Sequence, residues 1–243
     1  MSFSFFFRKK PQNLFRDMVD FHNHILPGID DGSQSVSQSL KMLELFTELG
    51  VEKIIASPHI YKELYPNTPK TIQTAYEVLD LKSKNTETRV SGYAAEYMVD
   101  EFFLESLRME NKLLCCFDKN ILIEIPFFGA VKIIDEVQFN LQNNGYAPIL
   151  AHPERYVHMR SKNIKAIKKK GVKMQLNALS LVGIYGSGIK KKAQSWLEQG
   201  LYDFVGTDAH NELQLSKLKK IQLNRKALKS WHKIRESQSQ FGI

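Results

Sequence analysis

The chain has 243 residues and a formal net charge of +8, with 43% hydrophobic and 25% charged residues. This length and balance exclude a small disulfide scaffold and fit one large α/β domain with a substantial core. Much of the positive charge lies in lysine-rich stretches at 162–173, 190–192 and 216–220. Aromatic residues do not interleave these lysines as they do on base-stacking surfaces. We therefore interpret the stretches as solvated helix faces and expect no nucleic-acid partner.

The first residues, "MSFSFFFRKKP", are apolar and then basic. A secretory signal has the opposite order and a longer apolar stretch, and no window of the chain is long and apolar enough for a transmembrane span. We predict a flexible N-terminal tail over residues 1–17, whose aromatic side chains pack on the domain. The alternative is a small anchor on a membrane surface or a partner. Residues 18–243 show no linker and are predicted to form a single domain that includes C-terminal helices.

The cysteines, Cys115 and Cys116, are adjacent in the sequence, and such neighbours rarely form a disulfide because the small ring is strained. A chain without a disulfide framework is typical of a reducing compartment, so we expect a cytoplasmic protein. A cysteine phosphatase needs an arginine about six residues after its nucleophile, where this chain has Ile121 and Leu122. We interpret both cysteines as packing residues.

After the tail, short β-rich runs alternate with stretches of helical spacing. In chain order, the pattern predicts a strand at 17–21, a helix at 35–50, a strand at 53–58, a helix at 67–84, strands at 89–96 and 120–126, a helix at 130–145, strands at 147–151 and 172–177, a helix at 188–200, a strand at 202–207, and one or two basic helices over 211–240. Such strand-then-helix units indicate parallel strands with helical crossovers. They favour an α/β barrel, with an open doubly wound sheet as the alternative.

Most of the histidines follow these predicted strands, together with several acidic residues. Because the carboxyl ends of parallel barrel strands open onto one face, we expect these side chains to converge there. The residues are His22, His24, His59, Glu96, Glu124, His152, Asp208 and His210.

A core gains nothing from burying so many unpaired imidazoles and carboxylates, whereas divalent cations supply the missing partners. Mixed histidine and carboxylate donors suit Zn, Mn or Fe, and the lack of thiolates argues against a purely structural zinc site. The donors exceed the needs of one ion, so we expect two or three ions. Such a cluster makes hydroxide at neutral pH and offsets oxyanion charge, as phosphoester hydrolysis requires.

The ordered motifs "DFHNHILPGIDDG", "ASPHI", "AAE", "IEIPF", "ILAHPERY" and "GTDAHN" resemble those of the PHP (polymerase and histidinol phosphatase) superfamily over residues 18–211. More closely, the chain resembles the bacterial tyrosine-protein phosphatases of capsule and exopolysaccharide operons. The resemblance implies a distorted (β/α)7 TIM-like barrel with a centre of two or three divalent ions, most often Mn and otherwise Fe or Zn. It also implies removal of phosphate from the tyrosine-rich tail of a membrane-associated kinase, either in the cytoplasm or peripherally at the inner membrane through that kinase.

The resemblance also assigns ligands. It places His22, His24, Glu96 and Asp208 on one ion, with Glu96 bridging to a second ion held by Glu124 and His152. A third ion would be held by His59, His210 and an aspartate of "GIDDG". We favour Asp31 over Asp30, and the other aspartate would be a turn residue.

For the substrate, the resemblance implies that Arg155 grips the phosphate, because its planar fork matches phosphate oxygens. A salt bridge to Glu154 or another neighbour is the alternative role. Arg155, Asp208 and His210 are the predicted catalytic residues. The family often has a second phosphate-binding arginine after its D-A-H-N motif, where this chain has only lysines. Lys217 or another lysine is therefore the predicted substitute, and the alternative is that this subfamily dispenses with the contact.

The predicted reaction is in-line attack on phosphotyrosine by a metal-bound hydroxide, without a phosphoenzyme. One alternative is a small-molecule phosphatase, such as a histidinol phosphatase, or a phosphodiesterase on the same metal scaffold. Another is a non-enzymatic module whose basic face docks an anionic partner.

Overall fold

The computed structural model describes residues 13–109, 112–126 and 132–239, and all strand pairs in it are parallel. One sheet has the order β1-β2-β4 and the other has the order β3-β5-β6-β7-β8-β9. The strands are β1 (Met18–Asp20), β2 (Val51–Ala56), β3 (His59–Ile60), β4 (Arg89–Tyr93), β5 (Glu96–Met98), β6 (Asn120–Glu124), β7 (Ala147–Ala151), β8 (Lys173–Asn177) and β9 (Phe204–Gly206).

The two sheets form one ring, because β2 continues into β3 and β4 continues into β5 after a short break in each. The backbone N–H of Ala94 donates to the carbonyl of Ala56 across the breaks at 2.7 Å. At the other edge, a parallel bridge joins Asn23 to Ala209, and the N–H of Asp208 donates to the carbonyl of His22. The predicted α/β barrel is therefore confirmed. The predicted strand at 89–96 is divided into β4 and the start of β5, whereas β3 lies after the predicted strand at 53–58.

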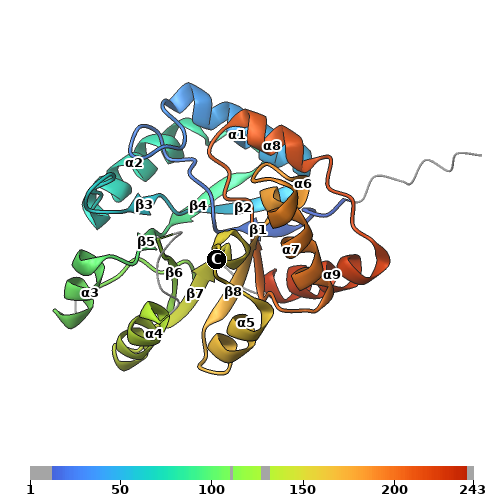
Figure 1. Cartoon of the computed structure of the whole chain (residues 1–243). Helices are drawn as coiled ribbons and strands as arrows, with labels where there is room; N and C mark the ends of the chain where they lie inside the picture. The colour runs from blue at the N-terminus through green and yellow to red at the C-terminus, as the bar shows by residue number, and fades with distance from the viewer. Residues whose placement is uncertain (1–12, 110–111, 127–131, 240–243) are drawn as a thin grey trace, which may run out of the picture.

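The helices lie around the outside of the strands (Figure 1). They are α1 (Val36–Leu49), α2 (Pro69–Lys82), α3 (Glu101–Arg108), α4 (Ile133–Asn143), α5 (Ser161–Lys168), α6 (Ala178–Val182), α7 (Ser187–Glu198), α8 (Glu212–Leu218) and α9 (Arg225–Gln238), with a 3-10 turn, η1, at Pro153–Arg155. The boundaries follow capping chemistry. Ser35 accepts from the N–H of Gln38 at the start of α1, and Gly50 ends that helix in the left-handed region at φ 83°.

The interior of the barrel is filled by a floor of apolar side chains below the strand ends. Phe21, Phe117 and Phe204 meet edge to face, with ring centroids 5.3 to 5.4 Å apart. Cys116 is buried in the same cluster, as predicted, whereas Cys115 is partly exposed. We refer to this cluster as the floor. Its members are Val19, Phe21, Ile55, Ala94, Cys116, Phe117, Leu122, Ile149, Ala151 and Phe204.

The described part of the expected tail, residues 13–17, packs against the last helix. Leu14 and Phe15 are buried. The Phe15 ring meets Trp231 of α9 edge to face at 5.4 Å, and the Trp231 indole N–H donates to the carbonyl of Leu14. The folded region thus begins before Met18, while the aromatic run at 3–7 lies outside the described residues.

Near its end, α9 also ties the first and last strands together. The side-chain amide of Gln238 donates to the carbonyls of Val19 in β1 and Val205 in β9, at 2.7 and 2.8 Å. Its oxygen accepts from the N–H of Val205. The helix therefore links β1 to β9 where the ring closes, below the backbone bridge between Asn23 and Ala209.

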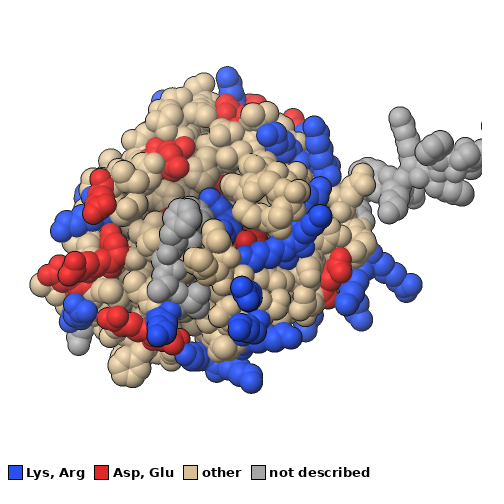
Figure 2. All heavy atoms as spheres, viewed as in Figure 1, with Lys and Arg blue, Asp and Glu red and all other residues tan. Residues whose placement is uncertain are grey.

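The lysine-rich stretches lie mainly on α5, α7 and α8, as predicted, and partly on the turns that follow α5 and α8, and several of their members pair with acids. Lys168 binds Asp203 at 2.6 Å and Lys170 binds Asp135 at 2.6 Å. Figure 2 shows Lys and Arg spread over much of one face, with Asp and Glu gathered toward α3. In the described part of the chain, no helix is both long and apolar enough to cross a membrane.

Candidate metal centre

The predicted metal ligands come together at the carboxyl ends of the barrel strands, around a cavity of about 640 Å³. His22 and His24, which follow β1, are fully buried beside it. The predicted ligands that line the cavity are Asp31, His59, Glu96, Glu124, His152, Asp208 and His210. His59 and Glu96 are the first residues of β3 and β5, directly after the breaks that follow β2 and β4.

The first group of ligands surrounds one buried carboxylate oxygen. Oε2 of Glu96 lies 3.1 Å from Nε2 of His22 and 3.5 Å from Nε2 of His24. Oδ1 of Asp208 lies 3.4 and 3.3 Å from the same two nitrogens. These residues are all buried, and they are the predicted ligands of one ion.

The second group shares Glu96 with the first. Nε2 of His152 lies 3.0 Å from Oε1 of Glu96 and 3.7 Å from Oε2 of Glu124. Nδ1 of His59 also faces this group, 3.3 Å from Glu96 and 3.2 Å from Glu124. Glu96 therefore lies between the two groups, where the predicted bridging ligand belongs.

Asp31 and Asp30 have different positions. Oδ1 of Asp31 lies 3.5 Å from Nε2 of both His59 and His210, on the cavity wall. Asp30 instead binds Nδ1 of His24 at 2.8 Å and accepts from the backbone N–H groups of Gly32 and His59. The geometry favours Asp31 as the ligand and gives Asp30 the task of orienting His24.

Other side chains orient the remaining histidines. Nδ1 of His22 binds Oε1 of Gln175 at 3.0 Å, and the same oxygen accepts from the backbone N–H of His152. Nδ1 of His210 binds the carbonyl of Asp208 at 2.9 Å. Because Nδ1 of His22, His24 and His210 has an acceptor, Nε2 of each ring is directed to the centre as a lone-pair donor.

Two glycines provide the space that His22 and His24, which follow β1, need. A Cβ at Gly32 would lie 2.1 Å from the carbonyl oxygen of His24, and a Cβ at Gly206 would lie 2.6 Å from Cβ of His22. Two of the four described non-glycine residues with positive φ also lie here. His152 and Asp208 have φ values of 33° and 51°, in the left-handed region that side chains rarely adopt and that is often found at functional sites.

The buried carboxylates of the site carry negative charge, which protons on the neighbouring imidazoles or bound cations must offset. Burial alone would lower the pKa of His22, but the Glu96 and Asp208 carboxylates outweigh burial and raise that pKa to about 9. Conversely, burial favours the neutral acid at Glu96, yet His22 and the other imidazoles hold the Glu96 pKa well below its usual range. Divalent cations would displace the imidazole protons and offset the same carboxylates.

Several buried polar atoms in the described residues lack a hydrogen bond and face the centre. They are Nε2 of His22, Nε2 of His24, Nδ1 of His59 and Oε2 of Glu96. Leaving such atoms unsatisfied is costly, and imidazole with carboxylate oxygen is a donor set for Mn, Fe or Zn. The site therefore fits divalent metal ions on its own chemistry.

Arg155 lies at the edge of this cluster and lines the cavity. Its Nη1 donates to Oδ2 of Asp208 at 2.7 Å, and its guanidinium lies over the Tyr185 ring at 4.3 Å. Glu154 is not its partner, because that buried carboxylate accepts from Ser180 and Tyr202 instead. The guanidinium is thus held in place from two sides, next to the predicted ions.

Lys217 is the predicted site residue that the fold does not bring to the cavity. It belongs to α8, which packs against α1 and α6, and it does not line the cavity. Among the described residues that do line it, Arg155 is the only lysine or arginine.

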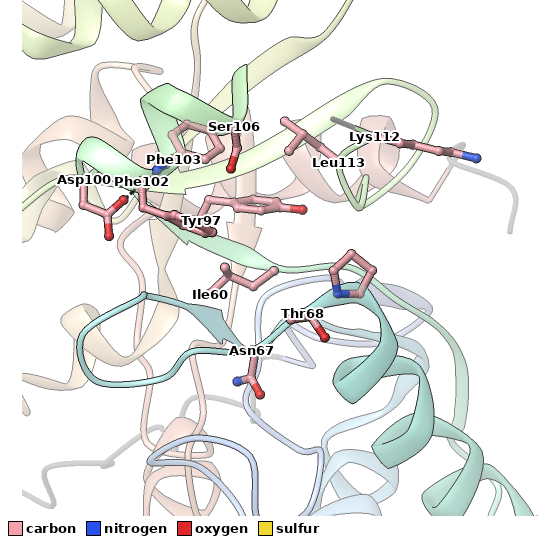
Figure 3. A pocket seen from close by; sticks show the side chains of 11 residues that line it. Ile60, Asn67, Thr68, Tyr97, Asp100, Phe102, Phe103, Ser106, Lys112 and Leu113 are labelled. Atoms are coloured by element: carbon pink, nitrogen blue, oxygen red, sulfur yellow. Dashed lines mark hydrogen bonds between the residues drawn. The ribbon is translucent and has the colours of Figure 1, made fainter. Parts of the chain in front are cut away.

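A second cavity, of about 320 Å³, lies behind the ligands rather than among them (Figure 3). Its lining residues Ile60 and Tyr97 directly follow His59 and Glu96 in the sequence. Successive strand residues face opposite sides, so this cavity lies on the outer side of β3 and β5, between α2 and α3. It contains no histidine and does not extend the metal centre.

Comparisons with known proteins agree with this geometry. The tyrosine-protein phosphatase YwqE of Bacillus subtilis is 32% identical over 197 residues, which cover 80% of this chain and 78% of YwqE. The putative tyrosine-protein phosphatase CapC of Staphylococcus aureus is 27% identical over 223 residues, covering 90% and 88%. Crystal structures of YwqE and of CpsB from Streptococcus pneumoniae are described as unique metal-dependent tyrosine phosphatases. The matching chain has a TM-score of 0.77 and 28% identity, with 93% of this chain and 96% of that chain covered.

The family model for capsular polysaccharide synthesis, CpsB/CapC, matches residues 18–230. That range contains every predicted ligand, Arg155 and all the strands. The chain therefore belongs to the CpsB/CapC family.

Proposed function

We propose that this chain is a metal-dependent protein tyrosine phosphatase. One observation carries the proposal: three groups of metal-binding side chains overlap, and His24, His59 and Glu96 each belong to two of them. Shared ligands are what a cluster of neighbouring ions requires, and such clusters suit phosphoester hydrolysis. The names of the family relatives support the same activity.

The proposed ligand sets are based on these overlapping groups with two changes. His152, 3.0 Å from Glu96 and 3.7 Å from Glu124, takes the place of His59 in the second set. His24 is kept in the first set alone. One ion would be held by His22, His24, Glu96 and Asp208, a second by Glu96, Glu124 and His152, and a third by Asp31, His59 and His210. We propose two or three ions in total, with manganese as the expected metal and iron or zinc as alternatives. When bound, these ions would supply an activated water and would offset negative charge on the phosphoryl group.

The other groups of the chain bind and orient the phosphate. Arg155 would contact the phosphoryl oxygens, since its guanidinium is fixed by Asp208 and Tyr185 at the cavity wall. Asp208 would orient Arg155 through Oδ2 and would bind the same ion as His22 and His24 through Oδ1. His210, held through Nδ1, would present Nε2 to the cavity beside Asp31. Lys217 has no proposed contact with the phosphate.

The proposed protein substrate is the phosphotyrosine-bearing tail of a membrane-associated tyrosine kinase. The sequence resemblance and the capsule-synthesis family support this partner. On this proposal the phosphatase works in the cytoplasm and reaches the membrane through the kinase.

The first test compares phosphotyrosine peptide and histidinol phosphate as substrates, with and without chelator. We expect chelator-sensitive hydrolysis of the peptide at a much higher kcat/KM than histidinol phosphate. A preference for histidinol phosphate would reject the proposal in favour of a small-molecule phosphatase. Activity that survives complete metal removal would reject the metal dependence.

A second test uses Arg155→Ala. We expect kcat/KM for the peptide to fall about a hundredfold or more, because a donor aimed at developing oxyanion charge is lost. Arg89→Ala is the matched control, since Arg89 is exposed at the start of β4, at the far end of that strand. Metal content is measured in both variants, because Arg155 also binds Asp208. An Arg155→Ala enzyme that keeps its metal and its activity would remove Arg155 from the site.

A further inference from the structure

The cavity at the metal centre has two chemically different walls. One wall carries the metal-binding side chains and Arg155. The other wall is apolar and aromatic, and consists of Tyr61, Leu64, Tyr65, Met98 and Pro126. The second wall offers little hydrogen bonding and no positive charge to a phosphate group. It therefore suits the organic part of a substrate.

Most of the apolar wall belongs to one tight turn, Tyr61 to Tyr65. The turn is closed by two backbone hydrogen bonds between these tyrosines, at 3.0 and 2.7 Å. At its base, the side chain of Asn67 donates to the carbonyls of Ile29 and His59. Lys62 lies over the Phe102 ring of α3 at 4.7 Å. Figure 3 shows Asn67 and Phe102 on opposite sides of the neighbouring cavity. The turn is therefore fixed relative to the ligand His59.

Two side chains of the turn are placed to meet a substrate ring. The Tyr65 ring lies parallel to the His59 imidazole, with centroids 5.3 Å apart and an interplanar angle of 11°. Leu64, at the tip, is 64% exposed although it lines the cavity. When an apolar ligand covers an exposed leucine on the wall of a binding cavity, the burial of apolar surface stabilises the complex.

We propose that the Tyr61–Tyr65 turn is the subsite for the phenyl ring of phosphotyrosine, and that Leu64 determines selectivity for aryl over alkyl phosphates. The inference rests on the proposed phosphatase function and names the part of the substrate that this wall recognises. With the phosphoryl group at the ions and Arg155, an aromatic leaving group would extend onto Leu64 and the edge of Tyr65. The short side chain of a phosphoserine would leave this surface uncovered.

The test compares Leu64→Ala with the unaltered, metal-loaded protein, using phenyl phosphate as substrate. We expect KM to rise about tenfold with little change in kcat, because truncating an apolar contact made equally in ground and transition states removes uniform binding. Leu64→Met should restore most of the affinity. Leu213→Ala is the matched control, since Leu213 is 66% exposed on α8 and does not line the cavity.

Calorimetric binding separates this inference from the function on which it rests. Leu64→Ala should weaken phenylphosphonate, a non-hydrolysable aryl analogue, about tenfold and leave inorganic phosphate unchanged. Equal weakening of both ligands, or of neither, would overturn the subsite. If the unaltered protein hydrolyses no aryl phosphate, the proposed function fails, while the phosphonate comparison still tests the subsite.

Discussion

The floor and the ligand cluster occupy the same barrel interior and are built by the same strands, yet they differ in polarity and in whether their side chains are satisfied by one another. Along β6 the inward side chains change from Leu122 in the floor to Glu124 at the cavity. The floor consists of apolar side chains that pack against one another, with aromatic rings in edge-to-face contact. The ligand cluster contains buried atoms without hydrogen bonds. One strand periodicity thus produces a layer that stabilises the fold and a layer that needs a ligand.

The sharpest way to break this comparison is Glu96→Gln, which removes one charge from the ligand layer at nearly constant volume. Glu96 lies within 3.5 Å of His22, His24, His59 and His152. We expect activity to fall about a thousandfold, because several kcal/mol of transition-state stabilisation depend on the ions. Metal content and turnover are measured beside Glu105→Gln, an exposed change on α3. A variant that retains metal and activity would contradict the bridging position.

Phe204→Ala is the corresponding change in the floor. It should lower the free energy of unfolding by about 3–5 kcal/mol, since a buried ring leaves a cavity that the barrel cannot refill. Urea unfolding measures this effect. Phe139→Ala is the control, because Phe139 is 62% exposed on α4 and its loss should cost less than about 0.5 kcal/mol. The separation of the layers would be refuted if folded Phe204→Ala lost metal as Glu96→Gln does.

Gln175→Leu acts between the layers and should have a smaller effect. It removes the acceptor for Nδ1 of His22 and for the backbone N–H of His152. We expect metal affinity to fall about 10- to 100-fold, as for other partners that orient metal-binding histidines. Competition with a chelator measures the affinity. Gln175→Glu keeps an acceptor at the same place and should lose less affinity. Unchanged metal affinity in Gln175→Leu would show that Gln175 only fills space.

The strands and the ligand cluster could be predicted from the sequence because both follow strong local patterns. Apolar runs fixed the positions of β6, β7 and β8, and the histidines follow such runs directly. The break at Ala94 could not be predicted, because the apolar pattern continues through it, whereas Ser57 and Pro58 interrupt the apolar run after β2 and the short strand β3 beyond them was not predicted. Nor could α6, a buried five-residue helix directly after β8 whose residues are as apolar as a strand.

Within the site, the residues that converge on the cavity were easier to predict than the residues that orient them. Adjacent aspartates carry no local signal that tells which one lines the cavity, whereas in the structure Asp30 is held by hydrogen bonds to His24 and Gly32. The local signal for Gln175 is alternation: Lys173, Gln175 and Asn177 alternate with Met174 and Leu176 along β8, which places both amides on the same face of the strand. Lys217 is predicted only as a substitute for a missing arginine, and it is not among the residues that line the cavity.

The packing of Leu14 and Phe15 against Trp231 brings the two ends of the folded region together. A polypeptide whose ends are adjacent can be circularly permuted, because a short linker replaces the original break without altering the barrel. New ends could be opened at Lys84 and Asn85, an exposed connection between α2 and β4. Such a permutant would carry the strands that position the predicted ligands in a different chain order around an unchanged ring.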